Sequence, residues 1–358
     1  MKLTINRRSF SDHLQSAFAV ASKAQKDVLG KVKLIACKVE GRYALHASDG
    51  EIGSVIKGEP LSANGGQCLL PNRVLSILRE SNEEDLTIEA TDREVLIYGD
   101  SARFSLPSQD PAEFPSVKEL DEGVQFDLAC DAVRLIGSQV GYAVDETSTR
   151  YQLGGVLFSV GEDRLDAVAT DGRRMARLAL ETTCSKTASG IVPAKALRTV
   201  TSTLGDGTCT ITLASNRAMF RSDSATLVIP LVDGRYPNWL NVIPADADPV
   251  PILAGPWFSV VKQASVVAPD DSRGITMSIK GGTLSMSART ADIGSSQVTM
   301  PVADGVEIET TVDWRFLADV LRSIDPTQTV DLHFAGSGRP VKLVAGQLTA
   351  VIMPMEKR

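Results

Sequence analysis

The residues ATDGRRMA at 169–176 place a carboxylate, a glycine and two guanidinium groups side by side near the middle of the chain. Asp171, Arg173 and Arg174 could hold a phosphate or act in acid–base chemistry, which needs a charged group beside a positioned partner. A hydrolase or phosphate-binding enzyme is therefore one hypothesis. The sequence shows no nucleophile motif, P-loop or dinucleotide-binding fingerprint near these residues, which weighs against it. The competing interpretation is a turn between two strands.

The other groups that carry metal or redox chemistry are scattered along the chain. The five cysteines form no Cys-x-x-Cys pair, and the three histidines, His13, His46 and His333, lie far apart. This pattern favours reduced structural cysteines, a cytoplasmic protein, and neither a metal site nor a cofactor. The sequence has no apolar run of about 18 residues and no secretory leader, so we expect no membrane association.

A repeat organises the chain at a spacing of 122 and then 120 residues. HASDGEIGSVI at 46–56 resembles VATDGRRMARL at 168–178, and SARTADIGSSQVTM at 287–300 is a weaker third copy. Helical segments that begin near Pro71, Pro193 and Asp313 keep the same spacing. The two prolines suit the first turn of a helix, and Asp313 suits its cap or first turn.

The repeat predicts an α+β fold with three similar domains, at 1–121, 122–246 and 247–358. Each copy opens with a strand and a helix and closes with a second helix and paired antiparallel strands, as the alternation in CTITLA at 209–214 indicates. The alternative is one large β-rich domain with coincidental spacing. The six predicted helices span 7–26, 72–80, 130–144, 193–204, 256–268 and 313–324.

Charge is distributed unevenly between these helices and the rest of the chain. The helical ranges hold twelve basic and five acidic residues, whereas the whole chain has a net charge of −7. One interpretation is a set of solvated helix faces. The other is a shared helical surface that meets a polyanion through its phosphates, in a salt-sensitive and sequence-independent way.

Four stretches in order carry a family resemblance: RFSLPSQDPAEFP (103–115), RYQLGGVLFSVGEDRLDAVATDGRRMARLAL (150–180), LVDGRYPNW (231–239) and AVIMPMEKR (350–358). With them the chain resembles the bacterial DNA polymerase III β subunit family, the replicative sliding clamps, over nearly its whole length. The resemblance implies a non-catalytic processivity factor. It further implies three DNA-clamp domains per subunit and a head-to-tail homodimer that closes a ring around double-stranded DNA, with helices lining the hole.

The resemblance also implies which residues meet DNA and the second subunit. The inward basic residues would be Arg7, Lys23, Lys26, Arg73, Arg79, Arg134, Lys195, Arg198, Lys262 and Arg322. At the subunit joint an edge strand of the first domain would pair with one of the third, with Phe104 and Leu106 facing Val266 and Val267. The acidic cluster of the family on the third-domain side is absent from TADIGSSQV at 290–298, so we expect fewer ion pairs there.

A peptide-docking pocket between the second and third domains is the other implied feature. Its partners would be the DNA polymerase III catalytic subunit, the clamp loader and other proteins with a clamp-binding motif. The matching positions are Leu153, Thr170, Gly172, Arg173, Arg174, Met175, Pro237, Val242, Phe316, Pro340, Val351, Met353, Pro354 and Met355. Methionines adapt to different partners, although Met and Val at such positions are more often ordinary core.

Some residues depart from the family pattern. Arg173 stands where histidine is usual, Asn241 replaces a common arginine, and Glu356 lies where a basic residue is usual. DVLGKVKL at 27–34 replaces the Leu-Pro-Ile-Leu segment of the family. A specialised paralogous clamp, or a β-rich interaction scaffold without a replicative role, therefore remains the alternative function.

Overall fold

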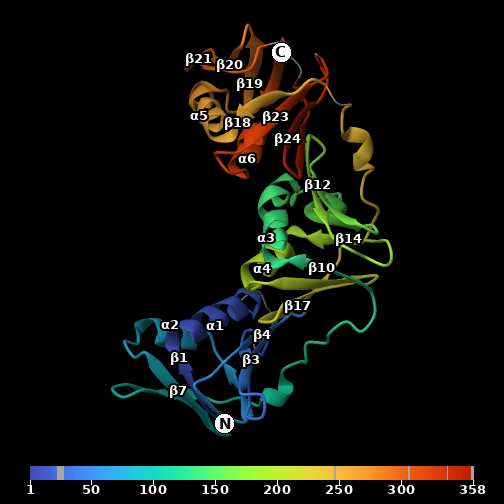
Figure 1. Cartoon of the computed structure of the whole chain (residues 1–358). Helices are drawn as coiled ribbons and strands as arrows, with labels where there is room; N and C mark the ends of the chain where they lie inside the picture. Colours follow the sequence, from blue (N-terminus) through green and yellow to red (C-terminus); the bar gives the residue numbers. More distant parts are fainter. Residues whose placement is uncertain (22–27, 246, 305–306, 337, 356–358) are drawn as a thin grey trace. The chain divides into compact units, whose positions relative to one another are not determined.

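The computed structural model describes residues 1–21, 28–245, 247–304, 307–336 and 338–355. Its helices alternate with antiparallel strands along the chain (Figure 1), which confirms the predicted α+β class. The chain divides into two compact units. The first comprises Met1–Arg134 and Thr182–Val232, and the second comprises Leu135–Glu181 and Asp233–Arg358. The middle copy of the repeat therefore contributes residues to both units.

The described residues form six α-helices, and each overlaps a predicted one. They are α1 (Arg7–Ala21), α2 (Arg73–Glu80), α3 (Cys130–Gln139), α4 (Ala194–Thr203), α5 (Ala254–Ala264) and α6 (Trp314–Arg322). Short 3-10 turns extend the chain beyond two of them: η2 (Gly141–Ala143) follows α3, and η5 (Ser265–Val267) follows α5. The predicted end of the first helix lies in 22–27, outside the described residues.

The starts of the helices bear out one of the three predicted signals. Asp313 is the N-cap of α6, and its carboxylate accepts the backbone N–H of Arg315 at 2.9 Å. Pro193 is the N-cap of α4, and Pro71 precedes Asn72, the N-cap of α2, so both prolines lie just before the first turn rather than within it. Strands run almost directly into these helices, and a proline there gives up no N–H that the helix needs.

The first unit contains two antiparallel sheets. The five-stranded sheet has the order β5-β1-β7-β8-β9, and the eight-stranded sheet has the order β10-β15-β16-β17-β4-β3-β2-β6. The strands of the unit are β1 (Lys2–Asn6), β2 (Val32–Cys37), β3 (Arg42–Ser48), β4 (Gly53–Gly58), β5 (Ser62–Asn64), β6 (Gly66–Leu70), β7 (Asp85–Ala90), β8 (Glu94–Tyr98), β9 (Arg103–Pro107), β10 (Val124–Ala129), β14 (Ala188–Pro193), β15 (Thr208–Leu213), β16 (Arg217–Arg221) and β17 (Ala225–Pro230).

Helix α1 shows how the core of the first unit forms. Phe10, Leu14, Ala17 and Phe18 recur at the spacing of one helix face and are all buried. This face packs on β3 and β4, and α1 also contacts α2 (Figure 1). The apolar stripe thus fixes the helix on the sheet and leaves the opposite side exposed.

The second unit repeats this construction. One sheet contains seven strands of the unit in the order β11-β12-β13-β25-β24-β23-β18, and a four-stranded sheet has the order β21-β20-β19-β22. Helices α5 and α6 contact each other, and α5 packs on β20 and β21. The strands are β11 (Gly155–Val160), β12 (Arg164–Thr170), β13 (Arg174–Glu181), β18 (Val250–Leu253), β19 (Gly274–Lys280), β20 (Thr283–Thr290), β21 (Gly294–Pro301), β22 (Ile308–Asp313), β23 (Thr329–Phe334), β24 (Val341–Ala345) and β25 (Leu348–Ile352).

The same kind of strand pair joins successive copies of the repeat. In the first unit β17 of the middle copy pairs with β4 of the first copy, with Thr226 opposite Val55. In the second unit β25 of the third copy pairs with β13 of the middle copy, with Ala176 opposite Ala350. At the repeat spacing, β9 corresponds to β17 and β25, and β21 corresponds to β4 and β13. Both β9 and β21 end their sheets.

Candidate functional site

The acid of the ATDG segment shapes a turn. Asp171 Oδ1 accepts the backbone N–H groups of Arg173 and Arg174, each at 2.9 Å. Thr170 Oγ1 accepts the N–H of Gly172 at 3.1 Å, and Gly172 has a φ of 85°, which glycine adopts without strain. The carboxylate is thus occupied by its own backbone, as in an Asx turn.

The first copy of the repeat builds the same turn. Asp49 Oδ1 accepts the N–H groups of Glu51 at 2.9 Å and Ile52 at 2.7 Å. Ser48 Oγ accepts the N–H of Gly50 at 3.1 Å, and Gly50 has a φ of 100°. Because this copy has Glu51 and Ile52 in place of the two arginines, the acid and the glycine serve the turn. The side chains after the turn are what distinguish the second copy.

Arg174 connects several elements of the second unit through its side chain. Its side chain is 12% exposed and bonds Asp171 at 3.0 Å and Asp319 at 2.7 Å. It also donates to the carbonyl of Tyr142 at 2.7 Å, and its guanidinium lies 4.5 Å from the centre of the Phe316 ring. Three of its N–H donors are used inside the protein, where they hold Phe316 on α6 next to β13, and its place in the wall of a docking pocket stays a prediction.

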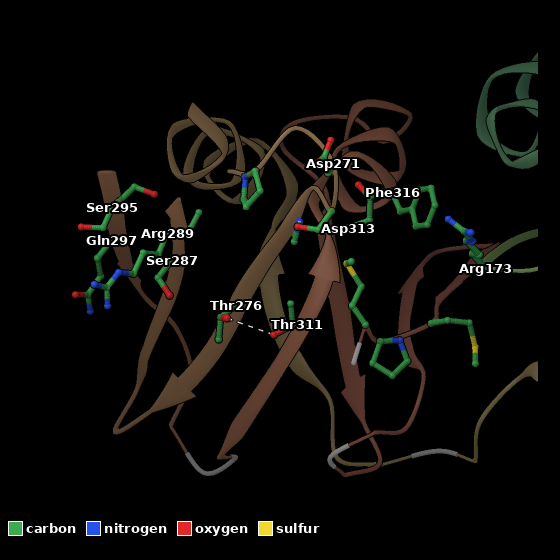
Figure 2. Close-up of a pocket in the computed structure, with 18 residues that line it drawn as sticks. Arg173, Asp271, Thr276, Ser287, Arg289, Ser295, Gln297, Thr311, Asp313 and Phe316 are labelled. Atoms are coloured by element: carbon green, nitrogen blue, oxygen red, sulfur yellow. Dashed lines mark hydrogen bonds between the residues drawn. The ribbon is translucent and has the colours of Figure 1, made fainter. Parts of the chain in front are cut away.

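Five of the predicted docking residues line one groove of about 1460 Å³ (Figure 2). Two backbone hydrogen bonds fix its C-terminal side: Met353 N–H donates to the carbonyl of Arg173, and Met355 N–H donates to that of Thr311, both at 2.8 Å. The thioether of Met353 belongs to a side chain that is 40% exposed. The five residues that meet here are Arg173, Phe316, Met353, Pro354 and Met355.

Other predicted docking residues lie beneath the surface. Leu153, Met175 and Val351 are 5%, 2% and 1% exposed, and Met175 pairs with Val351 across β13 and β25. These side chains are core in the described structure: Met175 and Val351 lie on strands in the middle of their sheet, and Leu153 lies in the 3-10 turn η3 (Tyr151–Gly154) before β11. Thr170, Gly172, Arg174, Pro237, Val242 and Pro340 lie outside the lining of the groove.

Tyr236 is a residue of this region that the sequence did not single out. Its hydroxyl accepts the N–H of Thr170 at 3.1 Å, and burial raises its pKa. Trp239 is buried nearby, with the guanidinium of Arg177 5.5 Å from its ring centre. Both rings hold the segment that carries Pro237 and Val242, which are exposed. In the sequence, the two aromatic residues of LVDGRYPNW were the feature that could have pointed to this anchoring role.

The structure divides the predicted DNA-facing residues into two groups. Arg73, Arg79, Lys195, Arg198, Lys262 and Arg322 are exposed on their helices. Arg322 bonds Asp319 at 3.2 Å, and the Lys262 ammonium lies 5.1 Å from the Trp314 ring centre. Lys23 and Lys26 lie outside the described residues.

Arg7 and Arg134 form the second group, because their guanidinium groups bond backbone carbonyls at the ends of other helices. Arg7 donates to the carbonyls of Leu78 at 2.9 Å and Glu83 at 2.7 Å, near the end of α2. Arg134 donates to the carbonyls of Leu204 at 2.7 Å and Gly205 at 2.6 Å, just after α4. A cation at a helix C-terminus satisfies carbonyls that have no partner within the helix. Both guanidinium groups thus have partners within the protein, and their role toward DNA stays a prediction.

The residues expected at the subunit joint lie in two kinds of structure. Phe104 and Leu106 are half-buried on β9, the last strand of the five-stranded sheet. Val266 and Val267 are not on a strand but in η5, and this 3-10 turn packs against β20 and β21. The strand that could pair with β9 is β21, because it ends the four-stranded sheet.

Two further observations concern the described part of the chain. No group of three or more His, Cys, Asp or Glu residues is arranged to hold a metal ion there. None of the helices traced in that part combines the length and apolar character that crossing a bilayer requires.

Relatives with high coverage are bacterial clamps. "Beta sliding clamp" of Chlamydia pneumoniae is 26% identical over 290 residues, 79% of each chain, and "Beta sliding clamp" of Staphylococcus aureus is 24% identical over 377 residues, 99% of each chain. A DnaN sliding clamp from Pseudomonas aeruginosa bound to griselimycin has the same fold, with a TM-score of 0.92, 24% identity and full coverage of both chains. The beta subunit of the Streptococcus pyogenes DNA polymerase has a TM-score of 0.91 to this chain, at 19% identity and with full coverage of both chains.

Three family models match in succession. They are the N-terminal domain of the DNA polymerase III beta subunit at residues 1–118, its central domain at 127–238 and its C-terminal domain at 241–356. The three-domain organisation predicted from the repeat is thereby confirmed. The chain belongs to the DNA polymerase III beta subunit family, the beta sliding clamps.

Proposed function

We propose that this chain does the work of its family as a processivity factor, by closing a ring on double-stranded DNA and tethering the polymerase there. Members of the family are non-catalytic subunits that work with DNA and a DNA polymerase. The occupied carboxylate of Asp171 agrees with such a role, because it serves a turn that the first copy of the repeat also builds.

The observation that supports ring closure is the pair of unmatched strand edges. Two copies of one joint, β17 with β4 and β25 with β13, already connect successive repeats. β9 and β21 correspond to these paired strands at the repeat spacing but end their sheets, so they can pair with a second copy of the chain. Such a head-to-tail contact forms a closed ring when the rotation closes and a filament when it does not. We propose closure by two subunits, with domain boundaries at 121/122 and 246/247.

Solution mass tests this arrangement. Light scattering should give twice the chain mass of 38.2 kDa. A mass equal to one chain at micromolar concentration would contradict closure through these edges, and a mass of three chains would require a different ring.

The exposed basic side chains on the helices support a DNA-facing surface. Arg73, Arg79, Lys195 and Lys262 are exposed on three different helices, α2, α4 and α5. Contacts of lysine and arginine with phosphates carry no sequence information and weaken with salt, which suits sliding. The net charge of −7 would repel DNA that is not threaded through the ring.

The groove at Met353 and Met355 is the proposed docking site for partner peptides, including those of the polymerase catalytic subunit, the clamp loader and other proteins with a clamp-binding motif. A Leu and a Phe anchor would contribute roughly 3–6 kcal/mol by burial. Micromolar binding needs about 8 kcal/mol net, so backbone hydrogen bonds must supply the rest. Weak and exchangeable partners follow from these magnitudes.

A fluorescence titration with a Gln-Leu-x-Leu-Phe peptide tests the docking site. Wild-type protein should bind at micromolar concentration, and the double variant Met353→Ala, Met355→Ala should bind at least tenfold more weakly. Val39→Ala, a change at a fully exposed turn, is the matched control. Equal affinity of the double variant and the wild type would remove the groove as the docking site.

A further inference from the structure

The groove at Met353 and Met355 continues across the outer face of the four-stranded sheet. Thr311, Thr276, Ser287 and Gln297 lie opposite one another on β22, β19, β20 and β21. All four line the groove together with the docking residues. Three strand spacings of about 4.8 Å make this polar row about 14 Å long. An extended peptide of about four residues would span it.

The row consists of groups that can serve either side of a hydrogen bond. The hydroxyls of Thr276 and Thr311 lie 3.3 Å apart, and hydroxyls and amides both donate and accept. The same strands turn Ile275, Met277 and Val312 to the opposite face, where they are buried. The polar face is thus the outer side of a normal half-buried sheet, which leaves its hydroxyls available to a ligand.

Met355 connects this row to the docking residues. In the neighbouring row of the sheet, Gly274 lies opposite Asp313. A Cβ atom at Gly274 would lie 3.6 Å from the sulfur of Met355. The Met355 side chain therefore lies over the sheet at Gly274, so the apolar cluster and the polar row form one continuous surface.

Charge distinguishes the two ends of the groove. Its charged lining residues are Arg173, Arg289, Asp271 and Asp313. Figure 2 shows Arg289 with Ser287, Ser295 and Gln297 at one end, and Asp271, Asp313 and Phe316 toward the other. Asp313 already caps α6. Arg289 is exposed, and the described residues form no ion pair with it, so its guanidinium can donate hydrogen bonds to a carboxylate of a ligand.

We infer that a docked partner peptide continues past its apolar anchors as an extended segment over the Thr311–Thr276–Ser287–Gln297 row and places an acidic side chain at Arg289. This inference rests on the proposed docking function. It adds a specificity element: partners whose motif is flanked by polar and acidic residues bind more tightly than partners with the bare motif.

Peptides that share one core test the inference on unaltered protein. The core Gln-Leu-x-Leu-Phe is compared with versions that carry five extra residues at either end, rich in Ser and terminating in two acids, two amides or two lysines. For one of the two ends, the acidic version should bind about 3–10-fold more tightly than the amide version, and the lysine version more weakly. The acidic preference should shrink as salt increases, because exposed charges are screened.

Single substitutions assign the preference to Arg289. Arg289→Ala should abolish the difference between acidic and amide extensions and leave the affinity of the core peptide unchanged. Lys280→Ala is the matched control, because Lys280 is an exposed cation on the same strand set but outside the groove lining. Asp271→Ala should keep the preference. The solution mass of each variant is checked, because β21 is also the proposed joint.

Two results would count against these proposals in distinguishable ways. Equal affinity of all extended peptides, or an acidic preference that survives Arg289→Ala, would overturn the role of Arg289 even when the core peptide binds. Failure of the core peptide to bind wild-type protein would instead contradict the docking function itself.

Discussion

At the residue scale, the charged side chains that look catalytic in the sequence form hydrogen bonds and ion pairs that stabilise the fold. Asp171 bonds two backbone N–H groups of its own turn, and Arg174 bonds two carboxylates and a carbonyl. The repeat already favoured the turn, because Asp49 occupies the same position without neighbouring arginines. The division of work between Arg173 and Arg174 could not be predicted, because it depends on Asp319, which is 145 residues away along the chain.

Arg174→Ala should lower the free energy of unfolding of the second unit by about 2–4 kcal/mol, because it removes the ion partner of Asp171 and the shorter of the two ion pairs of partly buried Asp319. Urea denaturation followed by tryptophan fluorescence measures the change. Arg173→Ala is the control, since that side chain is exposed and should cost no more than about 0.5 kcal/mol. Equal effects of the two substitutions would mean that the Arg174 contacts do not stabilise the fold.

His46 makes the stability of the first unit depend on pH. Burial, with a smaller effect of Lys33 opposite on β2, lowers the pKa of His46 from 6.5 to about 4. Because the folded pKa lies below the unfolded value, its contribution to stability is complete above pH 6.5 and is lost as the pH falls toward 4. Denaturation midpoints between pH 7 and pH 4.5 should fall less steeply for His46→Gln. Parallel profiles would contradict this assignment. Burial also lowers the pKa of His13, so some slope should remain.

At the element scale, the positions of the helices were predictable from the sequence, but the local structure at their ends was not. The periodic apolar faces and the repeat spacing located six helices within a few residues. The predicted helix at 256–268 included the joint residues Val266 and Val267, which occupy a 3-10 turn after the end of α5 at Ala264. The apolar pattern of SVVKQASVVA at 259–268 continues past Ala264, so it does not show where the α-helix gives way to a 3-10 turn.

Two predicted DNA contacts, Arg7 and Arg134, also illustrate this limit. Counting charges on helices recognises a basic surface, but it cannot tell which guanidinium groups bend back to cap the next helix. That choice is made by tertiary packing, which brings the ends of α2 and α4 within reach.

Leu106→Asp should convert the proposed dimer to a monomer, because the aspartate would place a charge on the edge strand β9 where the joint is proposed. Light scattering at micromolar concentration should then give 38.2 kDa instead of twice that value. Val39→Asp, at a side chain that is 96% exposed in the β2–β3 turn, should keep the wild-type mass. A dimeric Leu106→Asp variant with a native circular dichroism spectrum would exclude β9 from the joint.

At the scale of the whole molecule, the repeat accounts for the fold and also for the free strand edges that ring closure needs. Each copy has two edge strands, and the pairs β17–β4 and β25–β13 use one edge from each of two successive copies. In a chain of three copies, β9 and β21 remain for pairing with another chain. Closure of such a ring retains DNA by topology, and weak phosphate contacts then suffice to let it slide. The excess of basic residues on the predicted helices and the resemblance predicted this function from the sequence, whereas the strand edges that support ring closure required the structure.

Retention on DNA of defined topology tests the central claim, that the assembled chain encircles the duplex. The protein is loaded by a clamp loader onto a nicked circular plasmid, which is then isolated by gel filtration in moderate salt. The protein should remain on the circle and leave within minutes after a single restriction cut. Equal retention on circular and linear DNA would contradict encirclement and would show that the protein is held by contacts alone.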